Sequence, residues 1–223
     1  MALEFREYRE TDIDQMIAIW NVVVEAGDAF PQIEPLNEQS AREFFASQSY
    51  VGVAVIDESV FGLYIMHPNN IGRCAHIANA SYAVAKASRG LGLGKALVED
   101  SLRHATRLGF RGMQFNAVVA DNEAAIHIYE SLGFKRIGTI PGGFVSGAGS
   151  FENMYIYYRD CMELGSLDLF CEEMAADEVQ DGVSADQALE EKTSKKAKAK
   201  SKKKEKKKDS KDRKKSKSKK KKK

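Results

Sequence analysis

Charge is distributed so unevenly along this chain that only its first part can build a folded core. Of the 34 lysine and arginine residues among 223, 20 lysines and Arg213 fall within residues 192–223, together with three acidic residues. Residues 192–223 therefore carry +18, and residues 1–191, with 13 basic and 29 acidic side chains, carry −16. The basic segment has no aromatic residue and almost no apolar one, so nothing offsets the entropy of ordering its backbone. We expect it to be a disordered, lysine-rich tail.

The segment before the tail has a third composition. Residues 160–191 contain eleven acidic residues and no lysine or arginine, and their first half carries several apolar side chains. We expect a folded domain over residues 1–160, an acidic linker over 161–191 whose first half is suited to a short helix, and the tail over 192–223.

Several classes of protein are excluded by composition. No stretch approaches the roughly 18 apolar residues of a membrane span, and the N-terminus lacks the apolar region of a signal peptide. The three cysteines, Cys74, Cys161 and Cys171, are far apart and lack CxxC spacing, and the histidines lack ligand spacing, so we expect no metal site. Lysine clusters of this kind resemble nuclear targeting signals. We expect a cytoplasmic location, a nuclear one, or both.

Hydrophobic periodicity predicts a mixed α/β (α+β) domain with six to seven strands and four helices. The expected strands lie near residues 3–5 and at 50–56, 60–66, 76–84, 113–120, 134–140 and 152–159, and the expected helices follow an N-cap at Thr11 and span 38–47, 94–108 and 122–132. Hairpin-length links precede a single strand–helix–strand crossover. The sheet must therefore be largely antiparallel.

One glycine-rich segment stands between a strand and a helix. It runs Arg89-Gly90-Leu91-Gly92-Leu93-Gly94 and is followed by Lys95; we call residues 89–94 the glycine loop. Closely spaced glycines expose backbone N–H groups, and the next helix adds its unpaired N–H groups and positive dipole end. This combination suits a pyrophosphate, although the string matches neither GxxxxGK[ST] nor GxGxxG. The alternative is a glycine-rich turn with no ligand.

A second motif follows 28 residues after Gly94. It comprises Asn122, Ala125, Tyr129, Gly133 and Phe134. Together with Arg89, Gly92 and Gly94 it resembles the paired motifs of the GNAT superfamily of N-acetyltransferases, an Arg/Gln-x-x-Gly-x-Gly/Ala loop and a later Asn-x-x-Ala-x-x-x-Tyr-x-x-x-Gly-Phe helix. The resemblance covers roughly residues 3–159 and implies the GNAT fold, in which two neighbouring central strands splay apart.

The resemblance also implies roles for named residues. Acetyl-CoA would lie between the splayed strands and would be held by Ala83, Val84, Lys86, Arg89, Gly90, Leu91, Gly92, Leu93, Gly94, Lys95 and Asn122. Tyr129 would protonate the departing thiolate. Two of these residues have other readings from the sequence alone: Asn122 can cap a helix, and Tyr129 shares a helix face with apolar residues and can be a core aromatic.

Shorter matches point to one group within the superfamily. The segment from Phe30 to Glu34-Pro35 and the glycine-rich stretch that ends in Glu152-Asn153 resemble the phosphinothricin acetyltransferase group. Members acetylate amino-acid-like amines and are typically dimeric, which implies a small-molecule amine substrate and a homodimer. Phe30, Glu34, Asn79 and Glu152 would face that substrate.

The sequence departs from this group at its general base. Members place a glutamate five residues before the equivalent of Val84, where this chain has Asn79, and an amide cannot take a proton at neutral pH. Glu34, His76, Glu152 or a chain of waters would have to serve instead. The sequence leaves the choice between them open.

The function expected from these motifs is an acetyl-CoA-dependent N-acetyltransferase that moves the acetyl group directly to a primary amine. A small amino-acid-like acceptor is the first expectation. One alternative is a protein or peptide N-acetyltransferase recruited by its basic tail. The other is a non-catalytic GNAT-like adaptor that contacts nucleic acid or the ribosome.

The tail gives the first prediction. Lysines without aromatic residues can neutralise phosphates but cannot stack on bases, so binding of RNA or DNA through residues 192–223 should ignore sequence and weaken steeply with salt. Deleting these residues should abolish retention on heparin or RNA at low salt and leave the melting temperature and small-amine acetylation nearly intact. Retention that survives the deletion would place the polyanion site on residues 1–191 instead.

Overall fold

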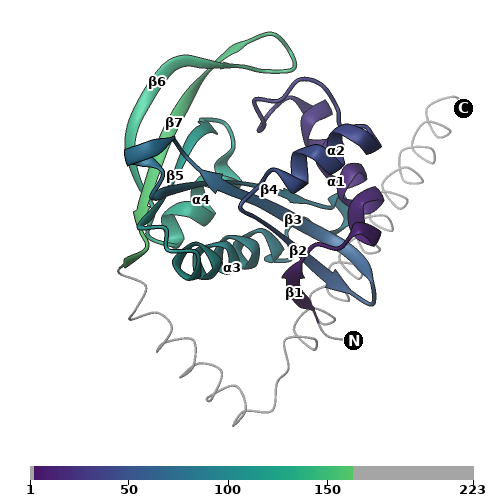
Figure 1. Cartoon of the computed structure of the whole chain (residues 1–223). Helices are drawn as coiled ribbons and strands as arrows, with labels where there is room; N and C mark the ends of the chain where they lie inside the picture. The colour runs from purple at the N-terminus through teal and green to yellow at the C-terminus, as the bar shows by residue number, and fades with distance from the viewer. Residues whose placement is uncertain (1–2, 163–223) are drawn as a thin grey trace, which may run out of the picture. The chain divides into compact units, whose positions relative to one another are not determined.

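A seven-stranded mixed sheet forms the centre of the domain. The computed structural model describes residues 3–162, so most of the expected linker and all of the expected tail lie outside the described residues. The strand order is β1-β2-β3-β4-β5-β7-β6, and the pair β4–β5 is the parallel one within the described part of the chain (Figure 1). The strands are β1 (Glu4–Glu7), β2 (Tyr50–Ile56), β3 (Ser59–Pro68), β4 (Ile77–Val84), β5 (Gly112–Val119), β6 (Lys135–Val145) and β7 (Phe151–Asp160).

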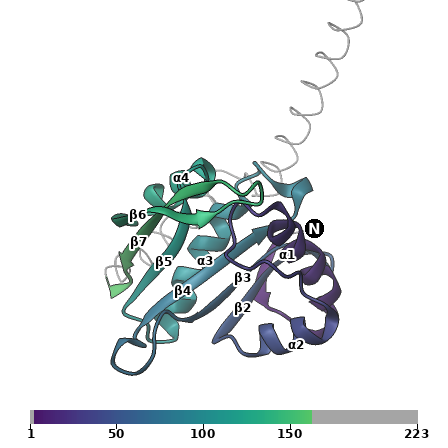
Figure 2. The ribbon, with the colours of Figure 1, turned by 90° about the horizontal axis from the view of Figure 1, so that it is seen from above.

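Four α-helices cover the sheet in two pairs. Helices α1 (Ile13–Ala26) and α2 (Glu38–Ala46) pack on one face, and α3 (Leu93–Arg107) and α4 (Glu123–Ser131) lie on the other (Figures 1 and 2). Successive strand residues point to opposite faces. On β3, Leu63 and Ile65 therefore join the core under α1 and α2, while Tyr64 and Met66 join the core over α3 and α4. This arrangement confirms the expected mixed, largely antiparallel α/β fold.

Local sequence signals explain several of the boundaries. The expected β2–β3 hairpin turns through Asp57 and Glu58, which both adopt the positive φ of a two-residue hairpin turn (48° and 62°). Helices α3 and α4 are each followed by a left-handed glycine, Gly109 (φ 81°) and Gly133 (φ 80°). None of the helices among residues 3–162 is both long and apolar enough to cross a membrane.

The two central strands separate soon after they begin. Strands β4 and β5 pair at only two positions, Ile77 with Gly112 and Ala78 with Met113, although both strands continue for several residues. The register between β5 and β7 shifts between Phe115 and Val118, so β5 bends where it leaves β4. The splayed central pair that the resemblance implies is therefore present.

Three local expectations were wrong. Asp12, not Thr11, is the residue before α1, because a 3-10 turn over Glu10–Asp12 precedes the helix. The helix expected to end at residue 108 ends at Arg107, and Leu108, the residue after it, is 48% exposed. Strand β6 continues to Val145, five residues past the expected end, because β7 pairs with it along a longer hairpin.

The turn of the β6–β7 hairpin reaches the end of α1. Figure 1 shows the hairpin projecting beyond the sheet towards the segment between α1 and α2. The Gly147 N–H donates to the carbonyl oxygen of Gly27, with 2.7 Å between the atoms. A Cβ at Gly27 would lie 2.7 Å from the Gly147 Cα, so the two backbones can approach this closely only because neither residue has a side chain there. We call this contact the Gly27–Gly147 bridge.

Buried Asp12 ties the start of α1 to β1. Its carboxylate accepts two hydrogen bonds from the Arg6 guanidinium, at 2.7 and 3.0 Å, and a third from the Arg9 N–H at 2.7 Å. Burial raises the pKa of Asp12, but the hydrogen bonds from Arg6 and Arg9 outweigh burial and hold the pKa below its usual 3.8. Asp12 therefore stabilises the fold while it is ionised.

Replacing Asp12 by Ala should lower the free energy of unfolding by roughly 3 kcal/mol, because Arg6 would lose its buried partner. Urea denaturation at pH 7 measures this loss. The deficit should shrink as the pH falls through the lowered pKa of Asp12, where the wild-type carboxylate also loses its charge. Arg42→Ala is the control, because its pair with Glu38 is exposed and should contribute less than about 1 kcal/mol. A D12A loss as small as that of R42A would contradict this assignment.

Candidate active site

A cleft opens where β4 and β5 part. It has a volume of about 470 Å³ and is lined by residues of β3, β4, β5, α3, α4 and the segment between α1 and α2. Six of the site residues expected from the sequence lie in its wall: Phe30, Asn79, Val84, Gly94, Asn122 and Tyr129.

The wall of this cleft carries no carboxylate, ammonium or guanidinium group among residues 3–162. Its polar side chains are neutral amides, hydroxyls and one imidazole, contributed by His67, Asn79, Ser81, Tyr82, Asn116, Asn122 and Tyr129. Burying an unpaired charge in such a place is costly. The cleft therefore suits an uncharged ligand segment, and charged parts of a ligand belong outside it.

The glycine loop lies at the mouth of the cleft. Helix α3 begins at Leu93, one residue earlier than expected, and Gly94 in its first turn also lines the cleft. Gly90 and Gly92 have φ of 77° and 88°, a conformation that side chains rarely adopt. Lys86, Arg89 and Lys95 are exposed around the loop. Unpaired N–H groups, a helix dipole and nearby cations are the features that favour an anionic ligand.

The backbone of β4 offers hydrogen-bonding groups to the cleft. The Ala85 N–H donates to Phe61 on the β3 side, at 2.9 Å. Polar groups alternate between the two sides of a strand, so those of Ala83 also face β3, and those of Tyr82 and Val84 face the gap towards β5. The Arg89 Nε lies 3.5 Å from the Val84 carbonyl oxygen and donates to it. Within the expected segment, Val84 rather than Ala83 presents backbone groups to the gap.

Tyr129 belongs both to the core and to the wall of the cleft. Its ring packs against Phe115, with centroids 4.4 Å apart, and contacts Phe134 and Tyr157. Its hydroxyl has no hydrogen-bond partner within residues 3–162, whereas the Tyr82 hydroxyl is 2.7 Å from the Ser101 Oγ. Burial raises the pKa of Tyr129, so the phenol keeps its proton at neutral pH. Of the two phenols in the wall, Tyr129 is the one whose hydroxyl is not engaged in a hydrogen bond within residues 3–162 and can donate to a ligand.

Asn122 begins α4 and also lines the cleft. Its Oδ1 accepts a hydrogen bond from the Ala125 N–H at 3.1 Å, which is the capping role left open by the sequence. The cap fixes the first turn of α4 and, two turns further on, the position of Tyr129.

Of the four residues expected to face the substrate, two line the cleft and two do not. Phe30 stacks on Trp20, with centroids 4.4 Å apart, and lines the cleft, as does Asn79. Glu34 and Glu152 are not among the lining residues. The backbone carbonyl of Glu34 accepts from Gln32, and the carboxylate of Glu152 accepts from Ser150 at 2.6 Å. His76 is exposed and also lies outside the lining.

Sequence reasoning missed four polar lining residues: His67, Ser81, Tyr82 and Asn116. The expected strand ended at Met66, yet β3 continues to Pro68 and carries His67 into the cleft. The sequence held one indication of this position. His67 follows Ile65 by two residues, and residues two apart in a strand point to the same face of the sheet. No group of three or more potential metal ligands occurs among residues 3–162.

Residues 16–134 match the acetyltransferase (GNAT) family, and this match spans the splayed strands, the glycine loop and α4. The chain belongs to this family of acetyltransferases.

Particular relatives agree with the assignment. The N-acetyltransferase aca1 of Schizosaccharomyces pombe is 31% identical over 155 residues, covering 61% of this chain and 74% of the relative. A GCN5-related N-acetyltransferase from Kribbella flavida superposes with a TM-score of 0.67 at 36% identity, covering 71% of this chain and 98% of the other. A phosphinothricin acetyltransferase from Sinorhizobium meliloti, solved with acetyl-CoA, shares the fold with a TM-score of 0.67 at 21% identity, covering 72% and 89%. Phosphinothricin acetyltransferases are thus among the structural neighbours, as the sequence resemblance predicted.

Proposed function

We propose that this chain transfers the acetyl group of acetyl-CoA directly to a primary amine. The observation that carries the proposal is the uncharged cleft between β4 and β5, with an anion-binding loop at its mouth. Acetyl-CoA has the matching division of charge, because its pantetheine arm and thioester are neutral and its phosphates are anionic.

The glycine loop is proposed to hold the pyrophosphate. The free N–H groups of Gly92, Leu93 and Gly94 at the start of α3 would donate to phosphate oxygens, as helix N-termini do. Arg89, Lys95 and Lys86 are exposed near this position and would add cationic contacts. Because these side chains are solvated, we expect each to contribute less than the backbone does.

The arm of acetyl-CoA is proposed to run along β4 in the place of a neighbouring strand. The backbone groups of Val84 and Tyr82 face this gap and would pair with the amides of the arm. An N–H from the same edge would polarise the thioester carbonyl as the amine attacks it. Asn122 would contact the arm from the start of α4.

Tyr129 is proposed to assist departure of the thiolate. When the carbon–sulfur bond breaks, negative charge builds on the sulfur, and the unpartnered phenol can donate a hydrogen bond and then its proton. Its raised pKa keeps the donor protonated across the neutral range.

The acceptor is proposed to be uncharged next to its amine. Within residues 3–162, the wall of the cleft offers no cation for the carboxylate of an amino-acid-like acceptor and no carboxylate for a polyamine. An aryl or alkyl amine, or a peptide amine, fits this lining better. The tail of residues 192–223, with 20 lysines, supports a further proposal of nuclear or polyanion association, which would bring a peptide acceptor to the enzyme.

A panel of acceptors tests the function. Purified full-length protein with acetyl-CoA should release coenzyme A thiol when supplied with aryl, alkyl or peptide amines, and more slowly with free amino acids. Binding of acetyl-CoA is measured separately by calorimetry. Absence of both acetyl-CoA binding and amine-dependent release would overturn the proposal, and binding without release would favour the adaptor alternative.

Gly92→Ala should weaken acetyl-CoA binding by at least about tenfold, because a side chain at φ 88° would force the loop backbone to move. Gly109→Ala is a matched control. Gly109 also has positive φ (81°) and open space around its Cβ position, but it lies at the far end of α3. Both variants should lose similar stability, and G92A alone should lose affinity in calorimetry. Equal affinities would contradict a phosphate-binding role for the loop.

Tyr129→Phe should lower kcat by about 100-fold and leave the dissociation constant of acetyl-CoA nearly unchanged, because the ring contacts remain and the proton donor is lost. Steady-state kinetics and calorimetry on one preparation measure the two quantities. Because burial raises the pKa of Tyr129, wild-type kcat should not fall between pH 7 and pH 9 through loss of this proton. An unchanged kcat in Y129F would refute the general-acid assignment.

A further inference from the structure

The attacking amine must lose a proton, and the expected base is missing. Asn79 occupies the place of the family's glutamate and cannot accept a proton. Glu34, Glu152 and His76, the alternatives taken from the sequence, lie outside the lining of the cleft. Among the lining residues in the described part of the chain, His67 carries the one imidazole, and imidazole is the side chain that most often serves as a general base.

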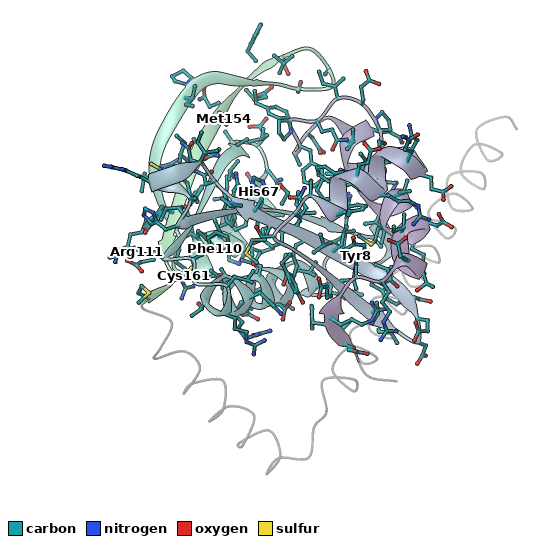
Figure 3. All side chains as sticks on the ribbon, in the orientation of Figure 1. Tyr8, His67, Phe110, Arg111, Met154 and Cys161 are labelled. Carbon is teal, nitrogen blue, oxygen red and sulfur yellow. The ribbon has the colours of Figure 1, made fainter. Side chains whose placement is uncertain are left out.

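His67 stands beside the position where the glutamate would be. In the antiparallel ladder of β3 and β4, His67 is the register partner of Asn79. Directly opposed residues point to the same sheet face, with Cβ atoms about 5 Å apart. An imidazole on β3 can therefore reach the space that a carboxylate on β4 would fill. Figure 3 shows His67 near the middle of the sheet, between the β6–β7 hairpin and helices α1 and α2.

The backbone fixes which ring nitrogen of His67 can accept a proton. Its Nδ1 lies 2.9 Å from the carbonyl oxygen of Pro68. A carbonyl oxygen only accepts hydrogen bonds, so Nδ1 must carry the hydrogen in the neutral ring and donate it. The lone pair of the neutral ring is then on Nε2, which has no partner within residues 3–162. The imidazole is thus held in the tautomer that a base requires.

The surroundings of His67 leave its ring accessible from two sides. In the described part of the chain, the titratable side chains that share its cleft are the phenols of Tyr82 and Tyr129, and no carboxylate from these residues lines the cleft. On the other side, His67 also lines an open groove of about 720 Å³, together with residues of α2 and the segment between β3 and β4, and that lining contains no charged side chain. His67 therefore borders both the cleft and this groove.

Asn79 is held by neighbouring amides. Its Nδ2 donates to the Asn69 Oδ1 at 3.2 Å, and the Asn116 Nδ2 donates to the same oxygen at 2.5 Å. The first of these bonds uses the amide nitrogen of Asn79 as the donor and leaves the Asn79 Oδ1 available to accept a hydrogen bond. An acceptor amine placed beside His67 can therefore also donate a hydrogen bond to Asn79.

We propose that His67 is the general base of this acetyltransferase and that its Nε2 takes the proton of the attacking amine; this inference rests on the proposed function. The amine nitrogen forms a bond to the acetyl carbon while the carbon–sulfur bond breaks. The nitrogen's proton passes to His67 Nε2, and the sulfur receives its proton from Tyr129. His67 then releases its proton to water and Tyr129 regains one, so the enzyme is restored. Asn79 is a positioning residue in this scheme.

The test uses the most weakly basic amine of the panel that is turned over. Such an amine is already unprotonated near pH 6, so any rise of kcat/KM with pH across the neutral range reports the enzyme. Wild-type kcat/KM should rise and level off. His67→Gln should be about 100-fold slower and should lose this rise, since glutamine cannot take a proton. His127→Gln, an exposed histidine on α4, is the matched control and should keep the wild-type profile.

A second variant separates the loss of the base from a disturbed fold. His67→Ala should bind acetyl-CoA with wild-type affinity and should regain activity when free imidazole is added. If H67Q keeps the wild-type rate and pH profile while the wild type is active, His67 is not the base. Slow variants that imidazole does not restore and that keep the pH-dependent rise would overturn the inference equally. An inactive wild type would instead contradict the proposed function.

Discussion

The two residue pairs that join β4 to β5 are the constraint on which this structure depends. If pairing continued, the sheet would be closed and no cleft would exist. Because it stops, the N–H and C=O groups of two central strands face a gap, and buried polar groups without partners are costly. The register of β5 with β7 shifts beside that gap, and residues of α3 and α4 line it. A ligand that supplies amides along β4 would satisfy what the sheet leaves unpaired.

Much of this fold could be predicted because its signals are local. The hairpin at Asp57-Glu58 and the glycine stops after α3 and α4 are each signalled within a few residues, and each of the two GNAT motifs is a short stretch of chain. The errors in element boundaries arose where a side-chain pair or the pairing of two strands, and not the repeating pattern within one element, sets the boundary. Asp12 follows β1 closely in sequence, but its place is fixed by the buried guanidinium of Arg6. The length of β6 depends on β7, which no pattern inside β6 reveals.

The residues of the site also fall into those that local motifs predict and those that depend on the three-dimensional fold. Asn122, Tyr129 and Gly94 belong to motifs with fixed spacing, and all three line the cleft. Glu34 and Glu152 were selected as carboxylates near matched segments, yet their side chains lie outside the wall. His67 was overlooked because its relation to Asn79 exists only through the register of β3 with β4. Its tautomer depends on a carbonyl one residue away, a contact that only the three-dimensional structure shows.

The Gly27–Gly147 bridge has a consequence for how this enzyme can change its acceptors. The bridge joins the hairpin turn to the end of α1 through main-chain atoms, close to Phe30, which also lines the cleft and is proposed to face the acceptor. Trimming a side chain there would not move the backbone that borders this space. A wider passage requires residues to be inserted into or removed from the turn at 146–150. Diversification of acceptor size in proteins built this way should therefore proceed by changes in loop length more than by point substitution.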